Sequence, residues 1–185
     1  MSNLLPTSST DPFTLVYCSL WDMLEAHTGF TGLVRVGNRI KFLGDRLKPT
    51  KQEITDTDLP EVCVEPDGVE PHLQATSART LLVQKFKIVA ASGNQRLDTL
   101  GPNGINAAIF PVAWEMLRAM IGWTSNLMVL TWPVAGGAPF VHLARPTGLT
   151  LALFHPKENR TILGWSAAWQ YEVHLNLLSA AMAPA

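Results

Sequence analysis

Histidine is the residue type here that most readily supports acid–base chemistry or metal binding. His27, His72, His142, His155 and His174 show no HxH, HxxxH or HExxH spacing. A zinc site would therefore have to be assembled from distant parts of the fold. His27 falls on an apolar helical stripe, which favours a satisfied core residue or a helix C-cap. The pattern predicts no metal site and no cofactor.

One serine stands in a sequence that partly matches a hydrolase motif. Ser166 lies in Gly164-Trp165-Ser166-Ala167-Ala168, which resembles the GxSxG nucleophile elbow without its last glycine. That elbow needs a sharp turn from strand to helix, whereas Ser166 lies inside an unbroken alternating segment. We interpret it as an ordinary strand serine.

The remaining candidates for chemistry also favour a structural interpretation. The AGGAP segment at 135–139 lacks the GK[ST] ending of a phosphate loop. Glu115 and Glu172 have no carboxylate neighbour in sequence for paired acid–base catalysis. Six tryptophans could line a ligand pocket, but such side chains more often fill cores and interfaces. We predict no enzymatic activity and no catalytic residue.

The element that would position many of these side chains is a long final strand. Residues 162–177 alternate without a break. One face is apolar and carries Leu163, Trp165, Ala167, Trp169, Tyr171, Val173, Leu175 and Leu177. The other face carries Ile162, Gly164, Ser166, Ala168, Gln170, Glu172, His174 and Asn176. We expect Trp165, Trp169 and Tyr171 to pack under helices, and Gln170, Glu172, His174 and Asn176 to face solvent, a channel or a neighbour.

The composition favours one domain that assembles with other subunits. The chain has 185 residues, 47% hydrophobic and only 16% charged, with a net charge of −1. Cys18 and Cys63 form no CxxC pair, which indicates neither zinc nor a disulfide framework. The first residues lack a signal peptide pattern, and no apolar run is long enough for a membrane span. We expect residues 1–185 to form a single domain with a flexible tail at 1–10.

Two helices are predicted. Asp11 is a candidate N-cap and Pro12 suits the first turn of an amphipathic helix that ends near Gly29. A second helix lies in 105–123, with Pro111 at its start or at a kink. Because only Glu115 and Arg118 are charged between 111 and 121, this helix is expected to be buried on most sides.

Several strands are predicted besides the last one. They cover 60–66, 79–91, 127–132, 140–144 and 149–154, with a loop at 67–77 and a tight hairpin around 135–139. Hairpins outnumber crossovers in this order. The predicted fold class is therefore α+β, a mainly antiparallel sheet with two principal helices packed on it and a long C-terminal strand.

An extended charged loop is predicted at 35–59. Its basic residues come first, and a cluster of acidic residues follows them and continues to residue 70. The basic cluster comprises Arg35, Arg39, Lys41, Arg46, Lys48 and Lys51. The acidic cluster comprises Glu53, Asp56, Asp58, Glu61, Glu65, Asp67 and Glu70. Solvated loops and complementary docking between copies or partners both explain such sorting. Phe42 is the only stacking aromatic in the basic stretch, which argues against specific nucleic-acid recognition.

Three segments together resemble a known family. They are FTLVYCSLWDMLEA with the following FTGLVRVGNRIKF, then DTDLPEVCVEP at 56–66, and finally GWSAAWQYEVHLNL at 164–177. They are similar to the tail-terminator and tail-completion proteins of long-tailed bacteriophages, which join head and tail. The likeness spans most of residues 13–177, and no single motif in it is diagnostic.

The resemblance implies a structural virion protein. It implies a homo-oligomeric ring, usually a hexamer, that caps the tail tube and presents a surface to the head connector or neck protein. Double-stranded DNA would pass through the lumen without specific binding. The protein would be assembled in the host cytoplasm, have no membrane contact and need no cofactor.

The resemblance also implies where contacts lie. Residues 35–55 would face the tube or a neighbour, and the final strand would belong to an inter-subunit or lumen-facing sheet. The interface residues expected on these grounds are Arg35, Arg39, Lys41, Arg46, Lys48, Lys51, Asp56, Asp58, Glu61, Gln170, Glu172 and His174.

Other functions stay open at this point. Within the same class, the chain could be a tail-tube or head-completion subunit. In a different class, it could be a small ligand-binding or hydrolytic domain that uses the Trp-rich face with His142 or His174.

Overall fold

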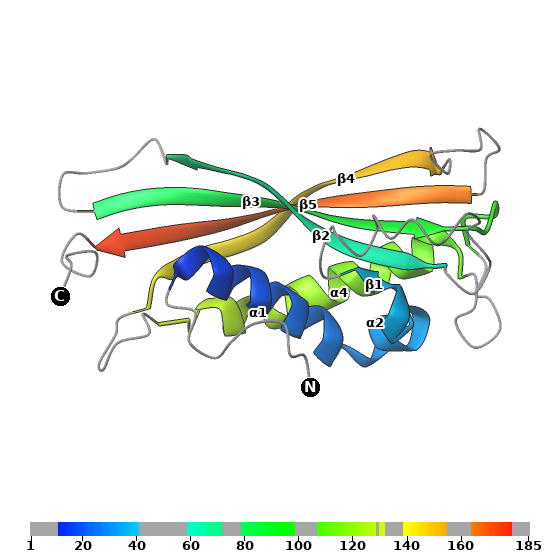
Figure 1. Cartoon of the computed structure of the whole chain (residues 1–185), viewed down its shortest axis with the longest axis horizontal. Helices are drawn as coiled ribbons and strands as arrows, with labels where there is room; N and C mark the ends of the chain where they lie inside the picture. The colour runs from blue at the N-terminus through cyan, green and yellow to red at the C-terminus, as the bar shows by residue number, and fades with distance from the viewer. Residues whose placement is uncertain are drawn as a thin grey trace.

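The fold is one five-stranded sheet with helices on one side (Figure 1). The computed structural model describes residues 11–40, 59–71, 79–98, 107–128, 130–131, 139–154 and 164–178. The predicted tail at 1–10 and residues 41–58 of the predicted loop lie outside the described residues. The α+β prediction with a long C-terminal strand is confirmed.

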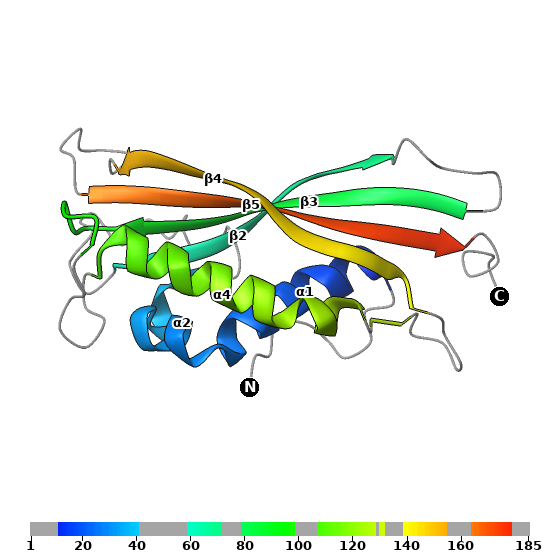
Figure 2. The same ribbon diagram turned by 180° about the vertical axis from the view of Figure 1, so that it is seen from behind.

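The sheet is built from four long strands and one short one. They are β1 (Arg39–Ile40), β2 (Glu61–Pro71), β3 (Arg79–Ser92), β4 (Val141–Phe154) and β5 (Gly164–Leu178), in the order β1-β2-β3-β5-β4. Only β1 and β2 run parallel, so the prediction of a mainly antiparallel sheet is confirmed. The strands fan out from a central crossing in both views, which is the ordinary twist of a sheet (Figures 1 and 2).

The first helix begins as the sequence predicts. α1 spans Pro12–Ala26, and the Asp11 carboxylate accepts a hydrogen bond from the Thr14 N–H at 2.8 Å. This bond satisfies a backbone donor that the first turn would otherwise leave unpaired. The apolar stripe of α1 is buried against the sheet and includes Leu20 and Trp21.

The predicted end of this helix near Gly29 is wrong. α1 stops at Ala26, and a second short helix, α2, spans Thr28–Leu33. His27 separates them in an extended conformation: its backbone N–H caps α1 and its ring caps α2. His27 thus caps both helices, and α1 ends at Ala26, three residues before the glycine.

The predicted burial of the second main helix is also wrong. α4 spans Ile109–Met128 and has Pro111 in its first turn. Its inner side is fully buried, but Phe110, Trp114 and Ile121 on its outer side are exposed. The outer side carries few charges and yet no described element covers it.

Two predicted loops turn out to be strand. β2 continues through Pro66 to Pro71, so the predicted loop at 67–77 starts too early. The strands predicted at 140–144 and 149–154 are one strand, β4, that runs through Arg145-Pro146-Thr147-Gly148. Register shifts at Pro66/Gly68 and Pro146/Gly148 absorb the turn-like residues as bulges.

The start of the charged loop and the predicted hairpin also differ from the structure. Within 35–59, Val36–Asn38 form a 3₁₀ helix, η1, and Arg39–Ile40 form β1. Within the strand predicted at 127–132, Leu127 and Met128 belong to α4, and Thr131 forms an isolated bridge with Pro139. Residues 132–138, where the hairpin turn was expected, lie outside the described residues.

The long final strand is confirmed. β5 is the central partner of both β3 and β4. Tyr171, Val173 and Leu175 are buried under the helices, and the Trp169 indole donates to the Ala113 carbonyl of α4 at 2.9 Å. Trp165 instead donates to the Gln95 carbonyl in the bend after β3.

Candidate functional site

The sheet face opposite the helices is the main candidate surface. α1, α2 and α4 all lie on one side in both views, and we call the other side, which no described helix or strand covers, the uncovered face (Figures 1 and 2). Alternation assigns side chains to it: Phe86 and Tyr171 are a buried pair facing the helices, so Lys85 and Glu172 face away from them. The charged side chains of β3 and β5 therefore share the uncovered face.

Six charged side chains on the uncovered face form what we call the charge ladder: Asp67, Glu70, Lys85, Lys87, Glu172 and Arg145. Lys87 Nζ lies 2.6 Å from Asp67 Oδ1, and Lys85 Nζ lies 2.7 Å from Glu70 Oε2. Arg145 Nη2 lies 3.6 Å from Glu172 Oε2. These are partly exposed pairs, whose individual contribution to stability is small.

The pKa of Lys85 reflects this arrangement. Its hydrogen bond to Glu70 raises the pKa of the ammonium group, and the nearby charges of Glu172 and Asp67 add to the effect. Lys85 therefore interacts with acidic groups from strands on both of its sides.

The polar side of β5 is only partly exposed as predicted. Gln170 is exposed and Glu172 half-buried; His174 lies on the same face as Glu172 but is only 7% exposed, so within one copy it does not face solvent. Its ring lies edge-on to His142 with centroids 5.6 Å apart, and Nε2 is 3.6 Å from Glu172 Oε2.

The fold thus brings together two of the histidines considered for chemistry. His142, His174 and Glu172 meet on β4 and β5. Within the described part of the chain, however, no group of three or more His, Cys, Asp or Glu is arranged to hold a metal ion. Ser166 lies inside β5 and its Oγ donates to the Ala152 carbonyl at 3.3 Å, which matches the strand role predicted for it.

The residues predicted from the basic loop fall into two groups. Arg35 is exposed, whereas the side chain of Arg39 is 8% exposed and donates to the Val34 carbonyl at 2.8 and 3.1 Å. Arg39 also approaches Glu25 at 3.8 Å, and burial lowers its pKa against the opposing effect of that carboxylate. Arg39 is therefore engaged inside the subunit.

Of the acidic residues at 56–61 that were predicted to lie at an interface, the structure describes one. Glu61 is half-buried at the start of β2. Lys41, Arg46, Lys48, Lys51, Asp56 and Asp58 lie outside the described residues.

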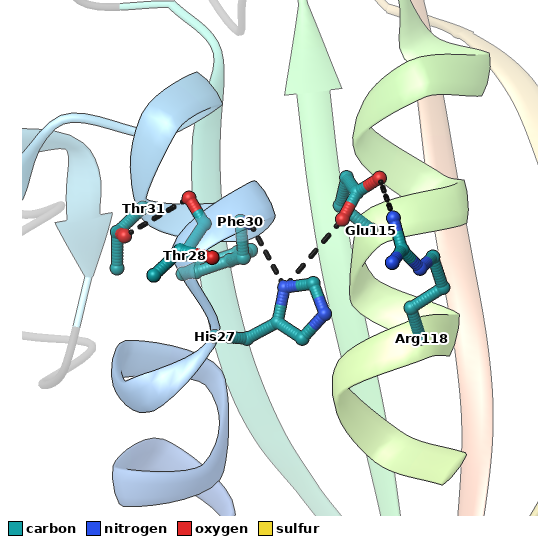
Figure 3. A network of polar contacts seen from close by, with 6 residues as sticks. All are labelled: His27, Thr28, Phe30, Thr31, Glu115 and Arg118. Carbon is teal, nitrogen blue, oxygen red and sulfur yellow. Dashed lines mark hydrogen bonds and ion pairs between the residues drawn. The ribbon is translucent and has the colours of Figure 1, made fainter. Parts of the chain in front are cut away.

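A polar joint fixes the helices to one another (Figure 3). His27 Nδ1 accepts from the Phe30 N–H at 3.2 Å and lies 3.5 Å from Glu115 Oε2 of α4. Glu115 Oε1 in turn accepts from Arg118 at 3.0 Å. Gly29 leaves room for this carboxylate, since a Cβ there would overlap it. Glu115 therefore packs against the α1–α2 turn and is bonded within α4 by Arg118, which is a structural role.

Exposed apolar side chains form a second surface feature that the sequence interpretation missed. On α4, Phe110, Trp114 and Ile121 share one side, with Trp114 58% and Ile121 61% exposed. Along β4, Leu149, Leu151 and Leu153 are exposed and follow one another at alternate positions. The spacing of 110, 114, 117 and 121 was a detectable signal, because it repeats an apolar position every three to four residues on the outer side of the helix.

Comparisons with known proteins do not assign the chain to a family. No family model matches it, and no curated protein matches it. Among the helices that the structure describes, none has both the length and the apolar character needed to cross a bilayer.

Proposed function

We propose that this chain is a structural subunit of a bacteriophage tail or neck. Six copies form a ring that terminates the tail tube and joins it to the head connector or neck protein. Double-stranded DNA passes through the lumen without specific binding. The subunit performs no catalysis and acts in the virion after assembly in the host cytoplasm.

The observation that carries this proposal is the amount of large apolar surface left exposed. Trp114 and Ile121 on α4 and the three leucines of β4 are exposed on a chain with only 16% charged residues. Monomeric proteins rarely leave such surface in contact with water, whereas assembling subunits bury it against partners.

The fold adds further support. The order of a helix, an antiparallel sheet and a second long helix packed on it agrees with what the resemblance to tail-terminator proteins implies. The engaged side chains of Ser166 and Arg39, and the structural joint at Glu115, are consistent with a non-catalytic subunit.

The test is the native mass of the purified full chain, followed by electron microscopy. We expect a closed ring of about six copies that binds the end of isolated tail tubes and stops their growth. Long tubes formed by this chain alone would instead identify a tail-tube subunit. A monomer at all concentrations that ignores tube ends would contradict the proposal.

A further inference from the structure

The charge ladder is ordered by strand. From one edge of the sheet to the other, β2 contributes acids (Asp67, Glu70), β3 bases (Lys85, Lys87), β5 an acid (Glu172) and β4 a base (Arg145). Each boundary between these strands is crossed by an attraction between opposite charges. Lys85, which interacts with both Glu70 and Glu172, links the two halves.

Because of this order, the charged side chains of the two edge strands, β2 and β4, have opposite signs. β2, EVCVEPDGVEP, has four acidic residues and no Lys or Arg, whereas β4, VHLARPTGLTLALF, has Arg145 and no acidic residue. β1 covers β2 only at Val62 and Cys63. Within the described residues, the outer edge of β4 and the rest of β2 therefore lack a neighbouring strand.

We propose that β4 of one copy lies antiparallel beside β2 of the next copy, so that Arg145 meets the acidic group of Asp67 and Glu70. The contact rests on the ring proposed above and names its subunit interface. β4 runs antiparallel to β5, which is antiparallel to β3, which is antiparallel to β2. Placing β2 of a neighbour beside β4 continues both the alternation of direction and the alternation of charge.

The helix side of the two edges matches as well. Leu149 pairs with Trp169, whose indole reaches α4, so Leu149 and the alternating Leu151 face the helix side of the sheet. Val69 pairs with Gln84, which donates to the Phe13 carbonyl of α1, so this exposed valine also faces the helix side. Each edge is charged toward the uncovered face and apolar toward the helix face.

Both edges also carry a bulge in the same row of the sheet. Pro66 pairs with Phe86, Phe86 with Tyr171, and Tyr171 with Pro146. Proline lacks the N–H needed for backbone pairing, and bulges discourage indiscriminate edge pairing. Recognition at this row therefore falls to side chains, which makes the charges beside it decisive for partner choice.

Contacts between like edges fit these charges poorly. Two β2 edges would bring their acidic groups together, and two β4 edges would leave Arg145 without an acidic partner from the neighbour. The head-to-tail contact is heterologous, which is the type of contact that builds a ring when the rotation between successive copies closes.

The experiment reverses the charge of one edge at a time in the full chain. Variant one is Arg145→Glu, and variant two is Asp67→Lys with Glu70→Lys. We expect each alone to weaken the contact about tenfold or more and to lower the native mass measured by light scattering. Mixed in equal amounts, the two should restore the ring, because each supplies the edge that the other needs. Native mass spectrometry should then find them in equal number.

The control is Arg96→Glu, the same charge change in the bend after β3 and away from both edges, which should leave the mass unchanged. Circular dichroism checks that each variant is folded. If a reversal unfolds the subunit, Arg145→Gln and the pair Asp67→Asn with Glu70→Gln replace it, each again expected to lower the mass.

The outcomes separate the two proposals. Folded variants that keep the wild-type mass, or a mixture that stays dissociated, would overturn the edge contact and leave the ring standing. A wild-type chain that is monomeric at every concentration would overturn the ring and the contact together.

Discussion

His27 caps two helices at once and so fixes the turn between α1 and α2. Its backbone N–H bonds the Leu24 carbonyl and its ring accepts from Phe30. The same ring lies 3.5 Å from Glu115 Oε2 of α4, although Nδ1, which accepts from Phe30, has no proton to donate to that oxygen. The stripe of apolar residues predicted His27 to be a core residue or a C-cap, and the C-cap role is confirmed. Its second role depends on α2, which the sequence did not reveal.

Gly29 is the residue that leaves space for this joint. Gly29→Ala should be less stable than Gly32→Ala by about 1 kcal/mol, because its new methyl group displaces the Glu115 carboxylate, whereas both variants gain the same helix propensity. Urea unfolding measures the change. Gly32→Ala is the matched control within α2, since nothing lies within 4 Å of its Cβ. An equal effect at both positions would mean that the joint contributes no stability.

At the scale of elements, α1 and β5 could be predicted from the sequence, whereas β2 and β4 could be predicted only in part. α1 and β5 were predictable because each has a long periodic pattern and α1 has a clear N-cap. The second half of β2 and the middle of β4 contain Pro66-Asp67-Gly68 and Pro146-Thr147-Gly148, which have the composition of turns. Edge strands tolerate such residues as bulges because no further strand needs their N–H groups.

The candidate surface was also only partly predictable, because it depends on which strands lie side by side. Glu172 and Gln170 were assigned correctly to the polar side of β5 by alternation. The charge ladder was not found, because it needs the knowledge that β5 lies between β3 and β4. The low exposure of His174 was not found, since alternation gives the face of a side chain but not what surrounds it.

Gly164 sets the closest approach of β5 to the bend after β3. A Cβ at this position would overlap the Ser92 carbonyl and come within 3.0 Å of the Asn94 carbonyl oxygen. Because these are backbone atoms that cannot rotate away, Gly164→Ala should destabilise the fold by about 1–3 kcal/mol. Thermal or urea unfolding measures this.

Gly148→Ala in β4 is the comparison, because the nearest atom to its Cβ is 3.9 Å away. We expect Gly148→Ala to be close to neutral. Equal stability of the two variants would show that the start of β5 is loosely packed against the bend.

At the scale of the whole molecule, the fold has one face covered by helices and edges of unequal character. The edge of β2 carries charges and two prolines, whereas residues 149–154 of β4 have no charge and no proline. Such a segment is prone to unwanted association unless a partner covers it. The assembled form is therefore expected to bury Leu149, Leu151 and Leu153.

Leu151→Lys tests this expectation. Loss of apolar burial should weaken each contact between copies by roughly tenfold or more, seen as a lower native mass at the same concentration. Ile121→Lys is the comparison, because it places the same charge on the other exposed apolar surface, that of α4, and so tests which of the two surfaces the contact between copies buries. A drop in mass for Ile121→Lys alone would move the interface to the helix layer.

The alternation of charge also determines how far the uncovered face acts on its surroundings. The ladder contains three acids and three bases, so its charges cancel. Strands lie about 4.8 Å apart, so the sign repeats about every 10 Å, and the potential of such a pattern decays over about 1.5 Å. A neighbouring edge in direct contact experiences the full pattern, while a polyanion separated from it by one layer of water experiences almost none. The ladder itself therefore acts mainly in direct contact, whereas Glu61 and Glu65, which β2 places on the same face, add negative charge that the ladder does not cancel.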